Sequence, residues 1–413
     1  MDTLETNYPS PTHLLVPEAR PTVLNLGASK IREVANAGMG KDDVLAFWFG
    51  EPDSVTPDFI REAAKQALDA GDTFYRHNLG LPELREALAS YLSRPNSDSN
   101  SKSNLRKIRA EQIAVTSSGV NALMLAAQTI LEPGDKVVAV VPLWPNLTEI
   151  PAILNAQVER HSLDFSPEGG WTLNLERLLE RITNQVRAVI INSPNNPSGW
   201  TMSSTQQARL LAHCREKGVW ILSDEAYDRI VFDGSYQASS MLDHVQANDR
   251  VLIANTFSKT WQMTGWRLGW LVGPANMIEQ IGKLIEFNTS CAPGFVQKAG
   301  LEAVLHGHLS TRQFVDQLKL RRDHLFQALA GMDRIQVVSP PGAMYLFFKV
   351  AGMKNSLETC KLWVRDFGLG LAPGEAFGPE STEFIRWCFA KSAGLLDDGA
   401  SRMHRALQQG AVR

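Results

Sequence analysis

Short, continuously apolar segments alternate with helix-like segments through the middle of this chain. The apolar segments are 113–116, 137–141, 188–192, 219–223, 251–255 and 268–272. Helical periodicity lies between them, at 119–131, 147–155, 174–183, 204–217 and 275–287. Apolar residues follow one another in these segments instead of alternating with polar ones, so each strand must be covered on both faces. The pattern predicts an α/β fold, with a mostly parallel central sheet between two layers of helices.

The two ends of the chain follow a different pattern. With 413 residues, the chain exceeds the usual size of a single core. Long helical stretches and isolated strand-like segments dominate after residue 300, which predicts a smaller α+β domain built from the N- and C-terminal segments. We therefore predict an N-terminal arm at 1–24, a first part of the small domain at 25–57, a large cofactor-binding domain at 58–295 and the rest of the small domain at 296–413.

Charge and cysteine content narrow the class of protein. The net charge is −3, which argues against nucleic acid or an anionic membrane surface as a partner. No segment is long and apolar enough to span a bilayer, and the first residues lack the apolar core of a signal peptide. The four cysteines, Cys214, Cys291, Cys360 and Cys388, are far apart in sequence and form no C-x-x-C pair. These features predict a cytoplasmic protein.

Chemically versatile residues follow the predicted strands. Ligands of a parallel α/β sheet bind beyond the carboxyl ends of its strands, so these residues are expected to share one crevice. They are Ser118, Gly119 and Val120 at a helix start, then Trp144, Asn196, Asp224, Tyr227, Thr256, Lys259 and Arg267.

A lysine at the end of a buried strand either forms a structural ion pair or reacts through its amine. A buried aspartate needs a cationic partner, and a protonated pyridine nitrogen is one such cation. A lysine that forms a Schiff base, together with an aspartate facing a pyridinium, is the binding signature of pyridoxal phosphate. The helix start and Arg267 would then bind the phosphate, and Trp144 would stack on the ring. Tyr227 and Asn196 would contact the phenolic oxygen.

Several motifs in a fixed order resemble those of the class I/II aminotransferases, in the aspartate aminotransferase superfamily of fold type I pyridoxal-phosphate enzymes. They are Tyr75 followed by G-x-P-E-L-R at 80–85, N-S-P-N-N-P-S-G at 192–199, S-D-E-x-Y at 223–227, Ser258-Lys259 with R-x-G at 267–269, and Ile385-Arg386. The similarity extends over roughly residues 25–405. A lone Ser-Lys pair would be weak evidence for this family, whereas five motifs in the family's order are specific evidence.

The resemblance implies a transaminase that moves an amino group from an L-amino acid to a 2-oxo acid by a ping-pong mechanism through pyridoxamine phosphate. Lys259 would form the Schiff base and shuttle a proton, while Asp224 would keep the pyridine nitrogen protonated. Ser118, Gly119, Val120, Thr256 and Arg267 would bind phosphate, with Tyr75 reaching over from a second subunit of a homodimer. Arg386 would hold the substrate α-carboxylate, and Gly50 would leave room beside it.

Two departures from the family concern the substrate. Residues 288–294 contain no cation where some aspartate-specific relatives have an arginine, which argues against a dicarboxylate. Trp48 and Phe49 precede Gly50, where many relatives have small residues. Together these features favour a neutral donor with an apolar or aromatic side chain.

Each proposed site residue also has an ordinary structural explanation. Asp224 could cap a helix, Arg386 could form a structural ion pair, and Trp144 could be core packing. Tyr75 could be a surface residue, and Gly50 a turn glycine. His306 and His308 do not predict a metal site, because residues two apart do not share a helix face. No metal is expected.

Other functions remain open at this level. A lyase, decarboxylase or synthase of the same fold would act on the same external aldimine. A pyridoxal-phosphate-binding regulator would need a DNA-binding segment, and the first 25 residues are too short for one. A purely structural protein would leave Lys259, Asp224 and Arg386 unexplained.

Overall fold

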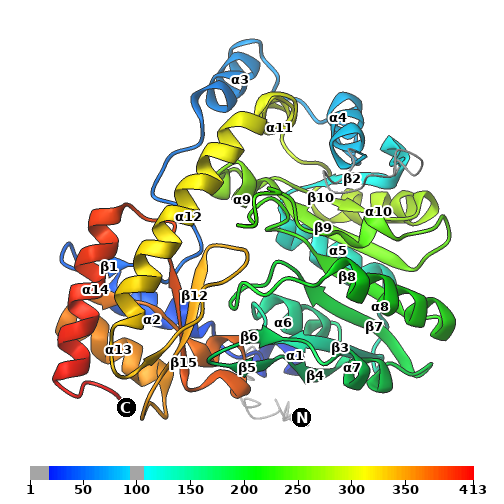
Figure 1. Cartoon of the computed structure of the whole chain (residues 1–413). Helices are drawn as coiled ribbons and strands as arrows, with labels where there is room; N and C mark the ends of the chain where they lie inside the picture. The colour runs from blue at the N-terminus through cyan, green and yellow to red at the C-terminus, as the bar shows by residue number, and fades with distance from the viewer. Residues whose placement is uncertain (1–17, 94–106) are drawn as a thin grey trace, which may run out of the picture.

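A central sheet organises the larger part of the molecule (Figure 1). The computed structural model describes residues 18–93 and 107–413, and within them the sheet has seven strands in the order β2-β10-β9-β8-β7-β3-β4. The strands are β2 (Ile113–Thr116), β3 (Lys136–Val141), β4 (Gln157–Ser162), β7 (Val186–Asn192), β8 (Trp220–Asp224), β9 (Val251–Thr256) and β10 (Gly269–Val272). All pairings from β4 to β9 are parallel, and β10 runs antiparallel to both β9 and β2. The predicted mostly parallel sheet is confirmed.

Strand β4 lies at the edge of the sheet, and the apolar pattern did not reveal it. In its sequence, Q-V-E-R-H-S, exposed residues are interspersed with partly covered ones and with the buried His161. Three of its six residues are exposed, so it does not need the continuous apolar run of strands that are buried along their whole length.

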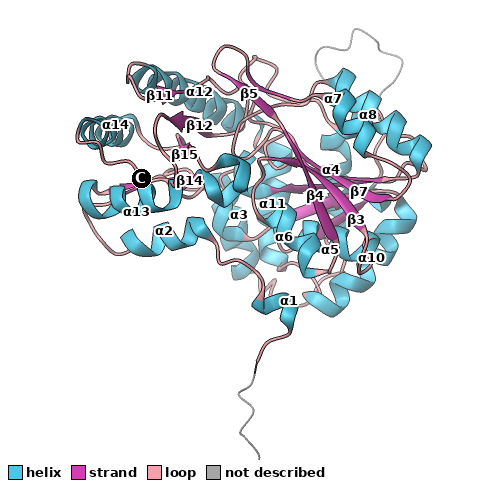
Figure 2. Cartoon of the chain, turned by 90° about the horizontal axis from the view of Figure 1, so that it is seen from below, coloured by secondary structure: helices cyan, strands magenta, loops and turns pink. Residues whose placement is uncertain are grey.

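Helices cover both faces of the sheet, as Figure 2 shows from below. Three of them, α5 (Gly119–Ile130), α6 (Asn146–Ile153) and α10 (Ala275–Asn288), share a core with Val137, Ala139 and Val141. The opposite core contains Val138 and Val140. It also contains residues of α3 (Asp58–Asp69), α4 (Pro82–Leu92), α7 (Leu175–Arg181), α8 (Ser204–Lys217) and α11 (Gly294–His306). Successive strand residues thus face opposite layers, which explains the continuous apolar runs.

The smaller part of the molecule is built around an antiparallel sheet. Its strands, in spatial order, are β11 (Ile335–Gln336), β12 (Tyr345–Val350), β15 (Phe384–Cys388) and β14 (Ala372–Pro373). The helices around it are α2 (Lys30–Gly38), α12 (His308–Ala330), α13 (Ser356–Phe367) and α14 (Ala393–Gln408).

The N-terminal segment joins this smaller part. A two-residue strand, β1 (Leu45–Ala46), pairs with β13 (Leu369–Gly370), and Phe47 and Trp48 are buried in the same core as α13 and α14. In Figure 1 the blue α2 accordingly lies beside the orange and red C-terminal elements. The exact domain boundaries stay a prediction.

Two predicted segments lie mostly outside the described residues. Of the N-terminal arm, only residues 18–24 are described, and they contain the short helix α1 (Pro21–Leu24). Thr22 of this helix donates a hydrogen bond to the side chain of Asn155. Residues 93–108 are rich in Ser and Asn, which predicts a surface loop, and of these 94–106 are also outside the described residues.

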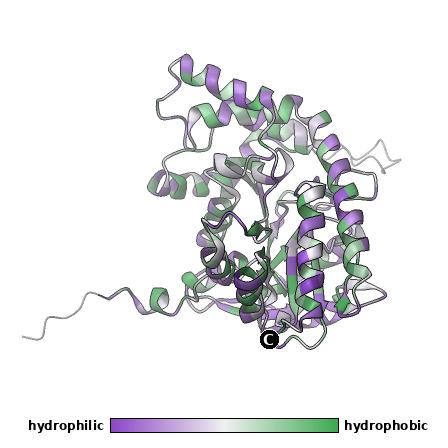
Figure 3. Ribbon diagram, turned by 90° about the vertical axis from the view of Figure 1, so that its left-hand side faces the viewer, coloured by the Kyte–Doolittle hydropathy of each residue, from purple (hydrophilic) through white to green (hydrophobic). Residues whose placement is uncertain are grey.

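Polar and apolar residues are distributed as expected for helices that each cover a core. Figure 3 shows purple and green segments in turn along many helices, which is the sign of amphipathic faces. Among the described residues, no helix combines the length and the apolar character needed to cross a membrane.

Candidate active site

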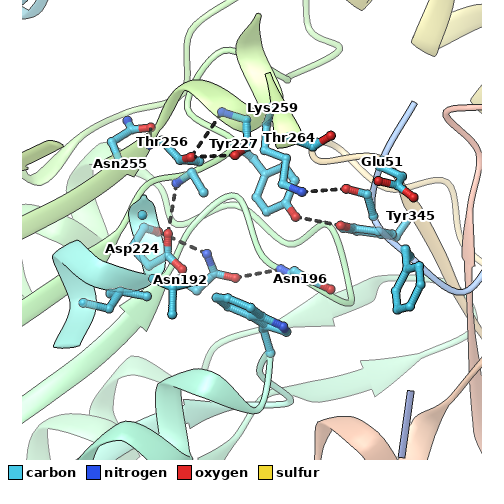
Figure 4. A pocket seen from close by; sticks show the side chains of 18 of the residues that line it. Glu51, Asn192, Asn196, Asp224, Tyr227, Asn255, Thr256, Lys259, Thr264 and Tyr345 are labelled. Carbon is cyan, nitrogen blue, oxygen red and sulfur yellow. Dashed lines mark hydrogen bonds between the residues drawn. The ribbon is translucent and has the colours of Figure 1, made fainter. Parts of the chain in front are cut away.

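Polar residues from three parallel strands meet at one edge of the sheet. Asn192 ends β7 and is the register partner of Asp224, which ends β8, while β9 ends at the neighbouring Thr256. A cavity of about 280 Å³ opens there and is closed on its other side by residues of the smaller part (Figure 4). Most of the residues predicted for the site line it: Gly50, Gly119, Val120, Trp144, Asn196, Asp224, Tyr227, Thr256, Lys259, Arg267 and Arg386.

Lys259 extends its amine across this cavity. It belongs to the four-residue helix α9 (Phe257–Thr260), which Thr256 caps at its start. The amine donates a hydrogen bond of 2.5 Å to the carbonyl of Gly50, and no acid of the described chain forms an ion pair with it. Burial lowers the pKa of Lys259 to about 8. A larger share of the amine is therefore uncharged, and so nucleophilic, near neutral pH.

Asp224 is a buried carboxylate with few partners. Its Oδ1 accepts one hydrogen bond, from the backbone N–H of Ala226 at 3.1 Å. Burial raises the pKa of Asp224 to about 6, and the charge of Lys259 opposes that rise. No helix begins in the turn over 226–229, so Asp224 does not serve as a helix cap. A buried acid of this kind fits a cationic heterocycle.

The start of α5 forms an anion cradle beside Lys259. Gly119 and Val120 line the cavity, and the hydroxyl of Ser118 caps the helix by accepting from the N–H of Asn121. Thr256 and Ser258 add hydroxyl groups, with their oxygens 2.9 Å apart. Arg267 lines the same end, where its Nη1 donates to the carbonyl of Thr264. Helix N–H groups, hydroxyls and a guanidinium are the donors that bind phosphate.

Arg386 brings a buried guanidinium into the cavity from β15. Its Nη1 donates to Oδ1 of Asn196 at 2.9 Å, and its Nη2 donates to the carbonyl of Trp48. The Nε atom is buried without a hydrogen-bond partner in the structure. No acid of the described chain forms an ion pair with it, so a structural ion pair does not account for its burial. An anionic ligand such as a carboxylate would satisfy this group.

Two predicted residues lie outside the lining. Ser118 sits just behind it as the cap of α5. Tyr75 lies between α3 and α4 with 89% of its surface exposed, and it does not reach the cavity of its own chain. The substrate-related segment 288–294 also lies elsewhere, since Thr289, Cys291 and Pro293 line a neighbouring groove. Of the two aromatic residues before Gly50, Phe49 lines the cavity and Trp48 packs into the small core.

Sequence reasoning missed several lining residues: Ile31, Glu51, Asn192, Ser258, Thr264 and Tyr345. Asn192 belongs to the N-S-P-N-N-P-S-G motif and Ser258 to the Ser-Lys motif, so their positions next to the strand ends could have identified them. Nothing in the sequence around Tyr345 distinguishes it from a core tyrosine, because its place in the site depends on how the two sheets face each other.

Pyridoxal phosphate fits this set of residues. The cradle at α5 would accept its phosphate, Asp224 would face its ring nitrogen, and the amine of Lys259 would lie within reach of its aldehyde. Strand β10 packs closely behind the cradle, since a Cβ at Gly269 would lie 2.6 Å from the backbone nitrogen of Gly119.

Known proteins resemble the chain over almost its whole length. The family described as "Aminotransferase class I and II" matches residues 42–403. An aspartate aminotransferase of Pyrococcus horikoshii is 32% identical over 389 residues, which is 94% of this chain and 96% of that protein. A probable N-acetyl-LL-diaminopimelate aminotransferase of Bacillus subtilis is 31% identical over 95% of each chain.

A solved structure shares the architecture as well. The aspartate aminotransferase of Thermotoga maritima superposes with a TM-score of 0.84 and 29% identity, covering 94% of this chain and 100% of that one. A family match across the chain, relatives above 30% identity and a fitting cavity all agree. The chain therefore belongs to the class I and II aminotransferases, pyridoxal-phosphate enzymes that transfer an amino group from an amino acid to a 2-oxo acid.

Proposed function

We propose that this aminotransferase acts on L-amino acids with a neutral, apolar or aromatic side chain, and that Lys259, Asp224 and Arg386 carry its chemistry. The supporting observation is that a free amine, a buried acid and a guanidinium with an unsatisfied Nε line one cavity. Pyridoxal phosphate, when bound, supplies a ring that spreads the negative charge developing at the substrate Cα.

The residues at the ring end hold and activate the cofactor. Asp224 accepts a hydrogen bond from the protonated ring nitrogen, and Trp144 stacks on the ring face. Tyr227 and Asn196 donate to the phenolic oxygen. The N–H groups at Gly119 and Val120 hold the phosphate together with Thr256, Arg267 and the helix start that Ser118 caps.

Lys259 has two tasks in this proposal. It would hold the cofactor through Nζ, and the same Nζ would take a proton from the substrate Cα and later return one. Its pKa of about 8 suits both tasks, because a neutral amine accepts the proton and a charged one returns it. While the amine carries no cofactor, its hydrogen bond to the carbonyl of Gly50 keeps it turned toward the small sheet.

The remaining lining favours an uncharged side chain. Arg386 takes the α-carboxylate, while Ile31, Phe49 and Tyr345 offer apolar surface nearby. The charged lining residue without a role in this scheme is the acid Glu51, which would repel a second carboxylate. The relatives' names do not select a donor, since proteins of about equal identity are named for aspartate and for N-acetyl-LL-diaminopimelate.

We also propose a homodimer with shared sites and a cytoplasmic location. The exposed ring of Tyr75 supports the first, because it lies outside the cavity of its own chain. All four cysteines are free, which supports a reducing compartment.

A panel of single amino acids tests the donor class. Each would be mixed with the yellow holoenzyme, and conversion to the pyridoxamine form would be followed by absorbance together with release of the 2-oxo acid. Phenylalanine, leucine and methionine should convert faster than aspartate and glutamate. Faster conversion by a dicarboxylate would overturn the substrate assignment. Lys259→Ala should abolish the conversion by every donor, and conversion at an unchanged rate would overturn the role of Lys259.

A further inference from the structure

A second phenol contacts Tyr227 inside the cavity. The hydroxyl oxygens of Tyr345 and Tyr227 are 2.6 Å apart, and their rings meet edge to face with centroids 5.8 Å apart. Both side chains are buried, with 1% of Tyr345 and 4% of Tyr227 exposed. Tyr345 comes from β12 of the small sheet, whereas Tyr227 follows β8 of the large one. Figure 4 shows the two hydroxyls pointing toward each other.

The position of Tyr345 is fixed at both ends of its side chain. The guanidinium of Arg386 lies over its ring, 4.4 Å from the centroid. Its hydroxyl fits against Gly50, where an added Cβ would lie only 1.8 Å from the hydroxyl oxygen. Tyr345 therefore has little freedom to swing away from Tyr227.

The direction of the hydrogen bond follows from counting hydrogens. A phenol has one hydrogen to donate. If Tyr227 donates its hydrogen to the phenolic oxygen of the cofactor, as in the proposed function, then the short bond between the two tyrosines must be donated by Tyr345. A hydroxyl that accepts a hydrogen bond becomes a stronger donor itself, by about 10–30% of the bond strength.

We propose that Tyr345 is a positioning residue that donates to Tyr227 and thereby strengthens the hydrogen bond from Tyr227 to the phenolic oxygen of pyridoxal phosphate. The inference rests on the role proposed for Tyr227. It extends that role, because it assigns a residue of the small sheet to the control of charge at the cofactor. A stronger donor stabilises negative charge on the phenolic oxygen, so the proton shared near that oxygen is lost at lower pH.

Charged and titratable groups surround this pair from several elements. Those facing it are Arg386 and Cys388 from β15, Asp224 from β8, Lys259 from α9 and Glu51 from the segment after Gly50. Removing a tyrosine hydroxyl leaves all of them in place, so a Tyr→Phe change isolates the contribution of the hydroxyl.

The test is a pH titration of the visible absorbance of the holoenzyme without substrate. Tyr345→Phe keeps the ring under Arg386 and removes only the donor. We expect it to raise the titration midpoint by about 0.3 pH unit, and Tyr227→Phe to raise it further. Tyr236→Phe is the matched control, because it removes the same atom from a phenol that bonds to Asp316 instead, and it should leave the midpoint unchanged.

A double variant decides whether Tyr345 acts through Tyr227. In the Tyr227→Phe background, Tyr345→Phe should cause no further shift. An equal shift in both backgrounds would overturn the proposal, as would an unchanged midpoint for Tyr345→Phe alone. A fluorinated tyrosine at position 345, which is a stronger donor of the same shape, should lower the midpoint. It tests the idea even if the phenylalanine variant folds poorly, and a midpoint that stays or rises would overturn it.

The outcomes separate this inference from the function beneath it. A wild-type protein that stays colourless with pyridoxal phosphate would remove the proposed function itself. If the protein is yellow but Tyr227→Phe leaves its titration midpoint unchanged, both the role of Tyr227 and this inference are wrong. If Tyr227→Phe shifts the titration midpoint but Tyr345→Phe does not, this inference alone is wrong.

Discussion

At the scale of single residues, the site contains groups that weaken the protein when no ligand is bound. Asp224 shows this most clearly, because a carboxyl with a raised pKa holds its proton in the folded state at a pH where the unfolded chain has lost it. Between pH 4 and 6 the folded state binds more protons than the unfolded state, so stability falls as pH rises through this window. The shift from 3.8 to about 6 corresponds to roughly 3 kcal/mol.

The first prediction follows for Asp224→Asn. The amide has nearly the same shape and carries no charge, so the variant should lack this pH-dependent loss. Without cofactor, the free energy of unfolding of the variant minus that of wild type should increase by up to about 3 kcal/mol between pH 4 and 6. Above pH 6 this difference should stay constant. Urea unfolding of both apoproteins at several pH values would measure it.

The same variant should bind pyridoxal phosphate more weakly, because an amide cannot balance a pyridinium charge. Titration of each apoprotein with pyridoxal phosphate, followed by the absorbance of the cofactor, would measure the affinity. A stability difference that does not change with pH would contradict the assignment of the raised pKa to Asp224.

At the scale of secondary-structure elements, the phosphate cradle depends on how closely α5 approaches β9 and β10. Gly269 of β10 is the register partner of both Thr116 and Thr256. A Cβ there would lie 2.6 Å from the backbone nitrogen of Gly119 and 2.8 Å from the carbonyl oxygen of Asn255. These are backbone atoms in a packed core, so they cannot move aside without moving the helix start.

The second prediction concerns Gly269→Ala. The added methyl group should push the start of α5 away from β10, lower stability by about 2 kcal/mol and weaken pyridoxal phosphate binding about tenfold. Gly265→Ala is the matched control, since nothing lies within 4 Å of a Cβ at that position in the nearby loop. Equal cofactor affinity for the two variants would show that the close approach of Gly269 to the start of α5 does not shape the phosphate cradle.

At the scale of the whole molecule, the site lies between the two parts of the chain. Gly50, Tyr345 and Arg386 come from elements of the small part, while the other proposed site residues come from the large one. Tyr75 remains outside, and two other aromatic residues are also largely exposed: Phe74 is 77% exposed and Phe287 is 91% exposed. Exposed aromatic surface of this kind is typical of an interface between chains.

The third prediction uses mixed dimers. If Tyr75 serves the cavity of its partner, a dimer of one Tyr75→Ala chain and one Lys259→Ala chain has one fully intact site. Mixing equal amounts of the two variants under conditions of subunit exchange should recover about a quarter of wild-type activity. Activity that stays at the sum of the separate variants would show that Tyr75 does not cross between chains. Mass measurement of the mixture checks that exchange occurred.

Local sequence patterns predicted most of the fold, for reasons that particular elements show. Strand Val251–Thr256 and helix Ser204–Lys217 were expected within one residue of their observed ends, because burial on both faces and helical periodicity are local signals. Strand β4 was not predicted, since its exposed polar residues interrupt the apolar run. Residues 44–49 are apolar and strand-like in sequence, yet only the short β1 forms there, because Phe47 and Trp48 are buried in the small core.

The sequence by itself determined the alternation of strands and helices, the residues at the strand ends and the motifs around Lys259, because these depend on the order of residues along the chain. Only the tertiary structure decided that Tyr345 bonds to Tyr227, that Arg386 keeps an unsatisfied Nε and that Trp48 turns away from the cavity. These facts depend on how two sheets, distant in sequence, face each other across the cavity, and no local pattern records that packing.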